Sequence, residues 1–246
     1  EWLSHQRRDE FWQHGSVCEN YADITCAVYA VGGWADGYTN AIPRLLEHLD
    51  SPRKGVIGPW AHNYPSNSNP QPSIGFQQES VRWWDYWLKG IDNGIMDEPM
   101  LHSYVQESDA PTVDRPKAAG QWVADANWPS PNVTERRFSW DEVRGVIGRQ
   151  TTGFDSPRWL AFGNKGDYGL DQRRDNGDSI CFTTDQQPTT AILGFANVDL
   201  RLTVDQPQAH LAVRLCDVAA DGAATLVTWG LLNLTHRNSH SHPEPV

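Results

Sequence analysis

The first third of the chain alternates short apolar runs with a stretch of helical periodicity. Residues 24–31 (ITCAVYAV) are nearly all apolar, which is typical of a strand covered on both faces. Apolar side chains then recur at helical spacing over residues 39–49, and residues 54–58 (KGVIG) form a second buried-strand pattern. This order predicts a βαβ unit, whose two strands are parallel and whose crossover is right-handed.

A second helix is predicted over residues 78–91. Its large apolar side chains fall on or near one face: Val81, Trp84, Trp87, Leu88 and Ile91. A stripe of this kind is more typical of core packing than of a cofactor site. We therefore expect these side chains to be buried.

After Asp97 the pattern changes to short, often alternating β-rich segments separated by Gly, Pro, Asp and Asn. These segments are residues 101–106, 178–184, 191–204, 209–219 and 225–234. Several such segments without helices between them are typical of an antiparallel sandwich. We predict two domains, an α/β part over residues 1–96 and a β-sandwich over residues 97–246, with the junction near residues 93–99.

Composition narrows the function classes. Aromatic residues make up 11% of the 246 residues and include twelve tryptophans, which favours a packed globule over disorder. The net charge of −11 argues against nucleic acid or an anionic membrane as a partner. The sequence shows no signal peptide and no apolar run near the ~20 residues that a membrane span needs, so we expect a cytoplasmic protein.

The four cysteines include no C-x-x-C pair, which excludes zinc ribbons and thioredoxin-like redox motifs. They are Cys18, Cys26, Cys181 and Cys216. Cys26 and Cys216 lie in apolar or alternating runs, where a free thiol behaves as a small buried hydrophobe. The histidines of the C-terminal HRNSHSH stretch are more typical of adventitious metal binding than of a built site. We expect neither a metal nor an organic cofactor.

The candidate chemistry lies in the loops that follow the two predicted parallel strands. One loop contains Asp36 and the other contains His62. The carboxyl ends of parallel strands meet at one edge of a sheet, so both side chains should lie there. Each residue taken alone is more often a turn or surface residue, but an Asp and then a His on consecutive late strands fits the order Ser…Asp…His of α/β-hydrolases.

Three ordered motifs carry a family resemblance. GGWADGY (residues 32–38), GPWAH (residues 58–62) and RWWDYWLKGIDNG (residues 82–94) resemble the family of cocaine esterases, X-prolyl dipeptidyl peptidases and α-amino acid ester hydrolases. Residues 200–237 look like the core of that family's C-terminal jelly roll. The resemblance implies an α/β-hydrolase fold, C-terminal portion with a parallel sheet, followed by an incomplete jelly-roll β-sandwich. It also implies that Asp36 is the triad acid and His62 the general base.

The nucleophile of such an enzyme is missing from the sequence, because no G-x-S-x-G occurs in the 246 residues. The resemblance places it, and the oxyanion-hole donors, in an upstream segment of the same protein. We therefore expect a serine hydrolase that cleaves an ester or an X-Pro peptide bond through an acyl-enzyme, with the chain alone inactive. A homo-oligomer is possible.

The neighbours of Asp36 bear on the substrate. Where amino-ester hydrolases place acidic residues, this sequence has Tyr38 and Thr39, which looks more like the esterase branch. Tyr38 is a candidate wall of the acyl pocket, equally open to plain packing, whereas Trp34 and Trp60 are expected to be scaffold.

An alternative function belongs to a different class. The sandwich would then be a non-catalytic module that binds carbohydrate or a protein beside a hydrolase remnant. Exposed aromatic residues would serve such a module, and the candidates are Trp122, Trp128 and Trp140. We favour burial of these three side chains between the two domains.

Overall fold

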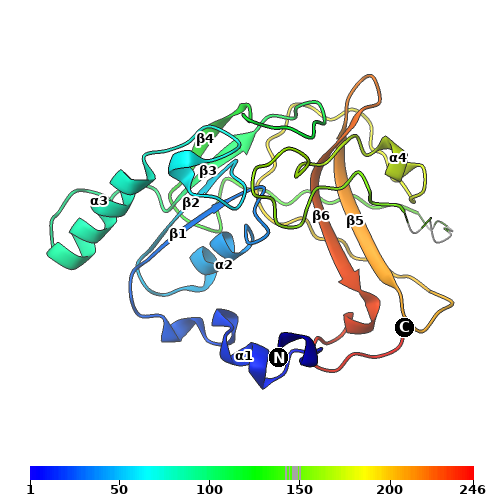
Figure 1. Ribbon diagram of the computed structural model, residues 1–246, viewed down its shortest axis with the longest axis horizontal. Coiled ribbons are helices and arrows are strands. Elements are labelled where there is room, and N and C mark those ends of the chain that lie inside the picture. Colours follow the sequence, from blue (N-terminus) through cyan, green and yellow to red (C-terminus); the bar gives the residue numbers. More distant parts are fainter. Residues whose placement is uncertain (142, 144, 146–148, 150) are drawn as a thin grey trace.

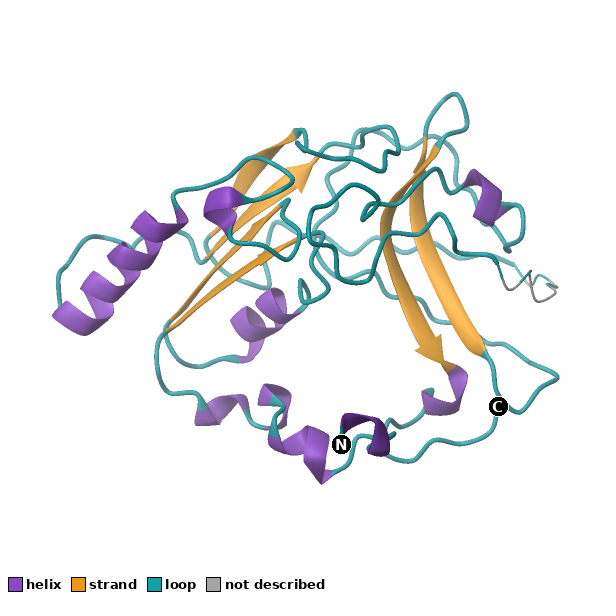
Figure 2. Ribbon diagram, in the orientation of Figure 1, coloured by secondary structure: helices purple, strands orange, loops and turns teal. Residues whose placement is uncertain are grey.

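The structure is a computed structural model that describes residues 1–141, 143, 145, 149 and 151–246. Its α-helices are α1 (Glu10–His14), α2 (Ala41–His48), α3 (Phe76–Lys89) and α4 (Arg173–Asn176). Its strands are β1 (Val28–Gly33), β2 (Arg53–Gly58), β3 (Leu101–Gln106), β4 (Gly120–Asp125), β5 (His210–Val218) and β6 (Ala224–Asn233). Short 3₁₀ helices lie at Trp2–Ser4, Val17–Glu19, Tyr21–Asp23, Pro65–Asn67 and Leu234–His236. Strands β1–β4 form one sheet and β5–β6 a separate hairpin (Figures 1 and 2).

The predicted βαβ unit is present. β1 and β2 pair in parallel, from Val28 opposite Arg53 to Gly33 opposite Gly58, and α2 connects them. Ile42 and Leu46 of α2 are buried in a cluster that also contains strand residues of the sheet. Helical spacing puts these side chains on the one face of α2 that packs on the sheet. Full burial of each contributes roughly 1.5–3 kcal/mol to the stability of the fold.

The start of β1 corrects two expectations. The strand begins at Val28 rather than at residue 24, and its side chains are largely half-buried. Cys26 therefore precedes the strand and is exposed, contrary to its predicted burial. Cys216 is half-buried on β5, where burial raises the pKa of its thiol. All four cysteines are free.

The sheet continues past residue 97. β3 pairs in parallel with β2 and antiparallel with β4, which gives the strand order β1-β2-β3-β4. The segment 101–106 is thus a strand, as predicted, but it extends the α/β sheet. The division into domains at residues 96 and 97 stays a prediction.

Helix α3 forms as predicted and ends at Lys89, and the φ of 68° of the capping residue Gly90 is left-handed and suits glycine. Its apolar stripe is not buried, which corrects the expectation of core packing. The exposed fractions are 56% for Val81, 53% for Trp84, 36% for Trp87, 74% for Leu88 and 48% for Ile91. The buried face instead carries Trp83, whose ring centre lies 5.2 Å from that of Tyr29. α3 points away from the sheet, and no described element covers its other side (Figure 1).

The C-terminal part is β-rich and holds fewer strands than the sequence predicts. β5 and β6 pair antiparallel, with a register shift at Leu215 and Cys216. Residues 178–184 and 191–204 contain no strand, because alternation alone does not supply the neighbouring backbone that a strand must pair with. The coarse architecture is therefore an α/β sheet followed by a β-rich C-terminal part.

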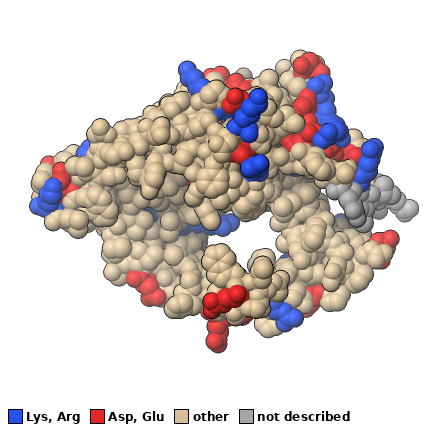
Figure 3. All heavy atoms as spheres, in the orientation of Figure 1, with Lys and Arg blue, Asp and Glu red and all other residues tan. Residues whose placement is uncertain are grey.

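The N-terminal segment arches below the sheet and reaches the C-terminal tail (Figure 1). There the Arg8 backbone amide donates to the His240 carbonyl over 3.1 Å. The space-filling view shows an open gap above this arch and a face made mostly of residues other than Lys, Arg, Asp and Glu (Figure 3). None of the helices in the described part of the chain combines the length and hydropathy that crossing a lipid bilayer requires.

Candidate active site

The two candidate residues meet at the carboxyl end of the parallel strands. Asp36 lies in the turn after β1, and His62 lies four residues after the end of β2. His62 Nδ1 is 2.9 Å from Asp36 Oδ2. The side chain of Asp36 is 13% exposed and that of His62 is 43% exposed. Both side chains thus lie at one edge of the sheet, as expected, and within hydrogen-bonding reach of each other.

The turn around Asp36 orients its carboxylate. Oδ1 accepts a hydrogen bond from the Tyr38 amide over 2.9 Å, and the Asp36 amide donates to the Gly33 carbonyl over 3.1 Å. One oxygen is therefore held by the turn while the other faces His62. Because an ionised carboxylate only accepts hydrogen bonds, the proton of neutral His62 belongs on Nδ1, which leaves the lone pair of Nε2 free.

Trp60 holds the two turns together, which supports its expected scaffold role. Its indole is 1% exposed and donates from Nε1 to the Pro72 carbonyl over 2.7 Å. A Cβ on Gly33 would lie 2.0 Å from the Trp60 carbonyl oxygen, and one on Gly58 would lie 2.2 Å from the indole. Only glycine at the two strand ends lets the chain pack this closely. Trp34 also acts as scaffold, since its Nε1 donates to the Tyr104 carbonyl over 2.7 Å.

A loop from the C-terminal part closes on the same site. The His62 amide donates to the Ala161 carbonyl over 2.7 Å, and the Phe162 ring meets the His62 ring edge-on at 5.4 Å. Trp159 lies against the other turn, where a Cβ on Gly37 would be 2.9 Å from its carbonyl oxygen. Sequence reasoning missed these residues. They lie about a hundred positions from His62, and no local periodicity marks them.

Tyr38 lies on the open side of the site. It is 64% exposed, and its ring centre is 5.7 Å from that of His62. Tyr38 and Phe162 thus both border the imidazole, whereas neither hydrogen-bonds to it. Among the described residues no hydroxyl or thiol forms a hydrogen bond with His62 Nε2, and no three His, Cys, Asp or Glu side chains converge as metal ligands.

Trp122, Trp128 and Trp140 occupy different surroundings. Trp128 is 8% exposed and belongs to the main apolar cluster. Trp122 is 38% exposed and packs against Trp60 and Tyr104. Trp140 is 51% exposed and stacks on Phe182. The three rings therefore form no common surface for a ligand.

Two successive segments of the chain match known protein families. Residues 1–64 match the family described as X-Pro dipeptidyl-peptidase (S15 family), and residues 93–246 match the one described as X-Pro dipeptidyl-peptidase C-terminal non-catalytic domain. A Mycobacterium bovis protein named as a serine esterase is 25% identical over 243 residues, which covers 89% of this chain and 37% of that protein. A Bacillus cereus protein named as a Xaa-Pro dipeptidyl-peptidase is 30% identical over 128 residues, 50% of this chain and 19% of that protein.

Two solved structures resemble the chain. An aminopeptidase from a marine sediment Thaumarchaeota archaeon covers all of it and matches over 47% of its own length, with 16% identity and a TM-score of 0.48. A CocE/NonD family hydrolase from Staphylococcus aureus matches over 53% of this chain and over 21% of its own length, with 14% identity and a TM-score of 0.37. At TM-scores below 0.5 neither likeness decides the fold. The sequence match over residues 93–246 alone spans more than half of the chain. The chain therefore belongs to the X-Pro dipeptidyl-peptidase (S15) family and corresponds to its C-terminal part.

Proposed function

We propose that this chain supplies the acid and the base of a Ser-His-Asp hydrolase that cleaves an ester or an amide. The observation that carries the proposal is the 2.9 Å contact between His62 Nδ1 and Asp36 Oδ2 at the carboxyl end of two parallel strands. That contact orients Nε2 as a free base. Membership of the S15 family agrees with this chemistry.

The chemical roles follow from the two side chains. His62 Nε2 takes the proton of a serine hydroxyl as the serine attacks the substrate carbonyl, and then gives that proton to the leaving alcohol or amine. In the second half a water attacks the carbonyl carbon of the acyl-enzyme while the same nitrogen removes its proton, and that proton then passes to the serine oxygen as the acyl–serine bond breaks. Asp36 holds the imidazole and stabilises its cationic form without itself taking the proton.

The serine, in this proposal, comes from a segment that precedes Glu1. The 246 residues contain no G-x-S-x-G, and the chain spans 37% of the length of the mycobacterial relative. The oxyanion-hole donors are assigned to the same segment. Without these groups, Asp36 and His62 would lack the largest electrostatic contribution to acyl transfer, so the chain alone should be inactive.

The surroundings of His62 favour an ester with an apolar acyl group. Tyr38 and Phe162 border the imidazole with aromatic rings, and neither position supplies a carboxylate for a substrate ammonium. Tyr38 is therefore proposed as a pocket wall. An X-Pro dipeptide remains the other candidate substrate, because one relative is named as a serine esterase and another as a Xaa-Pro dipeptidyl-peptidase.

The part of residues 97–246 that follows β4 is proposed to belong to a jelly-roll sandwich. β5 and β6 leave Leu215, Val227 and Leu231 exposed, which is typical of sheet faces that pack on another sheet. A carbohydrate- or protein-binding module is the weaker candidate, because the tryptophans that it would use are scattered or buried.

Steady-state kinetics of the full-length protein on a p-nitrophenyl ester test the proposal. His62→Ala should lower kcat by about 10⁴–10⁶, and Asp36→Asn by about 10⁴. His210→Ala removes an exposed imidazole at the start of β5 and serves as the control, with kcat unchanged. Rates near wild type for either site variant would show that the acid and base lie elsewhere.

A further inference from the structure

The loop of residues 158–167 binds the site through its backbone. Its Ala161 carbonyl accepts the His62 amide, and its Phe162 carbonyl accepts Asn63 Nδ2 over 3.2 Å. The Phe162 ring also stands edge-on to the imidazole at 5.4 Å. The position of His62 therefore depends on where this loop lies.

One buried carboxylate organises the loop. Asp167 is 1% exposed, and its Oδ2 accepts the amides of Phe162 and Asn164, each over 2.9 Å. Arg158 donates its amide to the Asp167 carbonyl over 3.0 Å, and its guanidinium lies 3.4 Å from Oδ1. Since the Arg158 side chain is 72% exposed, the backbone amides are the principal partners of this carboxylate. Their two bonds set the backbone of the segment that touches His62.

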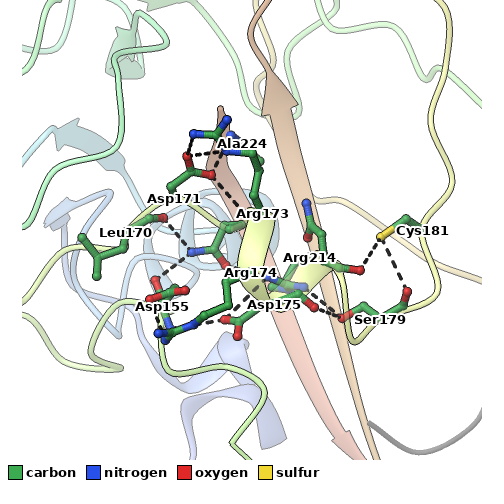
Figure 4. A network of polar contacts seen from close by, with 12 residues as sticks. Asp155, Leu170, Asp171, Arg173, Arg174, Asp175, Ser179, Cys181, Arg214 and Ala224 are labelled. Carbon is green, nitrogen blue, oxygen red and sulfur yellow. Dashed lines mark hydrogen bonds and ion pairs between the residues drawn. The ribbon is translucent and has the colours of Figure 1, made fainter. Parts of the chain in front are cut away.

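The residues that flank the loop are fixed to β5. Gln172, which is fully buried, donates from Nε2 to the carbonyls of Asp155 and Leu170 over 2.7 and 2.8 Å. Its Oε1 accepts from Arg214 of β5 over 2.8 Å. Figure 4 shows this network joining the segments on both sides of the loop to the hairpin. Both ends of the loop are thus fixed, and the Asp167 carboxylate sets the backbone conformation of the residues between them.

We infer that Asp167 is a positioning residue for His62, an inference that rests on the proposed hydrolase function. It acts through the loop: its carboxylate holds the amides on both sides of Gly163, the Ala161 carbonyl fixes the His62 backbone, and Phe162 limits the tilt of the imidazole. Without the carboxylate the part-buried amides of Phe162 and Asn164 lose their acceptor, and the loop has to move to satisfy them. Displacement of a general base by about 1 Å is enough to cost on the order of 10² in rate.

The test is a set of variants of the full-length protein assayed on a p-nitrophenyl ester. Asp167→Ala should lower kcat on the order of 10²-fold while KM changes by less than about threefold, because the proposed pocket wall Tyr38 lies outside the loop and stays in place. Asp167→Asn should restore kcat to within about threefold of wild type, since the amide oxygen still accepts both backbone amides. Its thermal midpoint is measured alongside.

Asp125→Ala is the matched control. Asp125, the last residue of β4, is 2% exposed, and its Oδ1 accepts hydrogen bonds from Ser130 Oγ and, over 3.2 Å, from Asn132 Nδ2, outside the 158–167 loop. Asp125→Ala should lower the thermal midpoint by about as much as Asp167→Ala does, and it should leave kcat within about threefold of wild type. Equal losses of kcat in Asp125→Ala and Asp167→Ala would overturn the inference, and so would an Asn variant as slow as the Ala variant.

A second variant, Asn63→Ala, tests the inference if Asp167→Ala does not fold. Asn63→Ala removes one of the side-chain hydrogen bonds that the loop receives, while Asn69 keeps its bond to the Gly163 carbonyl, and it should lower kcat in the same direction at unchanged KM. Unchanged kcat in Asn63→Ala would count against the inference if Asp167→Ala cannot be purified. Wild-type activity in His62→Ala would overturn the proposed function itself. An inactive His62→Ala together with a fully active Asp167→Ala would overturn only the positioning role of Asp167.

Discussion

Glycine at the ends of β1 and β2 is what allows the two site turns to meet. Gly33 and Gly58 pair across the strands, and the Trp60 backbone and ring fill the space where their Cβ atoms would be. Trp60 in turn leads directly through Ala61 to His62. The motifs GGW and GPW thus carry a packing requirement.

Gly58→Ala should lower both stability and activity. Its Cβ would lie 2.2 Å from an indole that is 1% exposed and held by the Pro72 carbonyl, so the ring cannot move aside. Overpacking of this kind costs about 1–3 kcal/mol, measured as the free energy of unfolding in urea. Gly15→Ala is the control, because its Cβ meets nothing within 4 Å and should change stability by less than about 0.5 kcal/mol. Equal effects of the two substitutions would contradict the packing argument.

His102 on β3 should make stability depend on pH. Burial, and then the nearby Lys54 charge, hold the pKa of His102 below its ordinary 6.5. Between that lowered pKa and 6.5 the unfolded chain binds more protons than the folded one. The free energy of unfolding should therefore fall as pH drops through this window and level off below it. Urea unfolding of wild type and His102→Gln from pH 8 to about 5 measures the difference. A difference that does not change with pH would refute the assignment.

The sequence predicted the central pair but not its surroundings. Asp36 and His62 could be paired because strand order and the shared strand end are local features of the sequence. Ala161 and Phe162 could not be foreseen, since their approach to His62 depends on long-range closure of the 158–167 loop. The burial of Asp167 was hidden for the same reason, because a short Gly- and Asp-rich stretch looks like an ordinary surface loop.

Among the elements, α2 and α3 show what periodicity can and cannot decide. Both helices lie where their apolar spacing predicts. Periodicity places α2 against the sheet correctly, but for α3 it identifies an apolar stripe without showing what covers it. Trp83 faces Tyr29, while Trp84 and Leu88 are exposed. We propose that the upstream segment covers this stripe in the full-length protein.

Two substitutions on α3 distinguish its faces. Trp83→Ala should destabilise the chain by about 3–5 kcal/mol, because its ring is buried. Leu88→Asp should change the chain alone by less than about 0.5 kcal/mol, since Leu88 is 74% exposed. In the full-length protein the same change should cost about 2 kcal/mol or more, as a charge then enters an apolar contact. Thermal and urea unfolding of both forms provide the measurement. A neutral Leu88→Asp in the full-length protein would show that this face stays exposed.

In the molecule as a whole, the α/β sheet and the β-rich C-terminal part meet at the site. The 158–167 loop contacts the turns after β1 and β2, while Gln172 and Arg214 fix its flanks to β5. The family name of residues 93–246 calls this a non-catalytic domain. Its contacts nevertheless give it a part in holding His62.

In the proposed mechanism, Asp36 and His62 activate a serine from outside the 246 residues. This can be tested by labelling the full-length protein with a fluorophosphonate probe, followed by mass spectrometry of the labelled peptide. We predict one labelled serine in the segment that precedes Glu1, and labelling that falls by at least about 10³-fold in His62→Ala, since the hydroxyl then lacks its base. A label on a serine within residues 1–246, or equal labelling of wild type and His62→Ala, would contradict the claim.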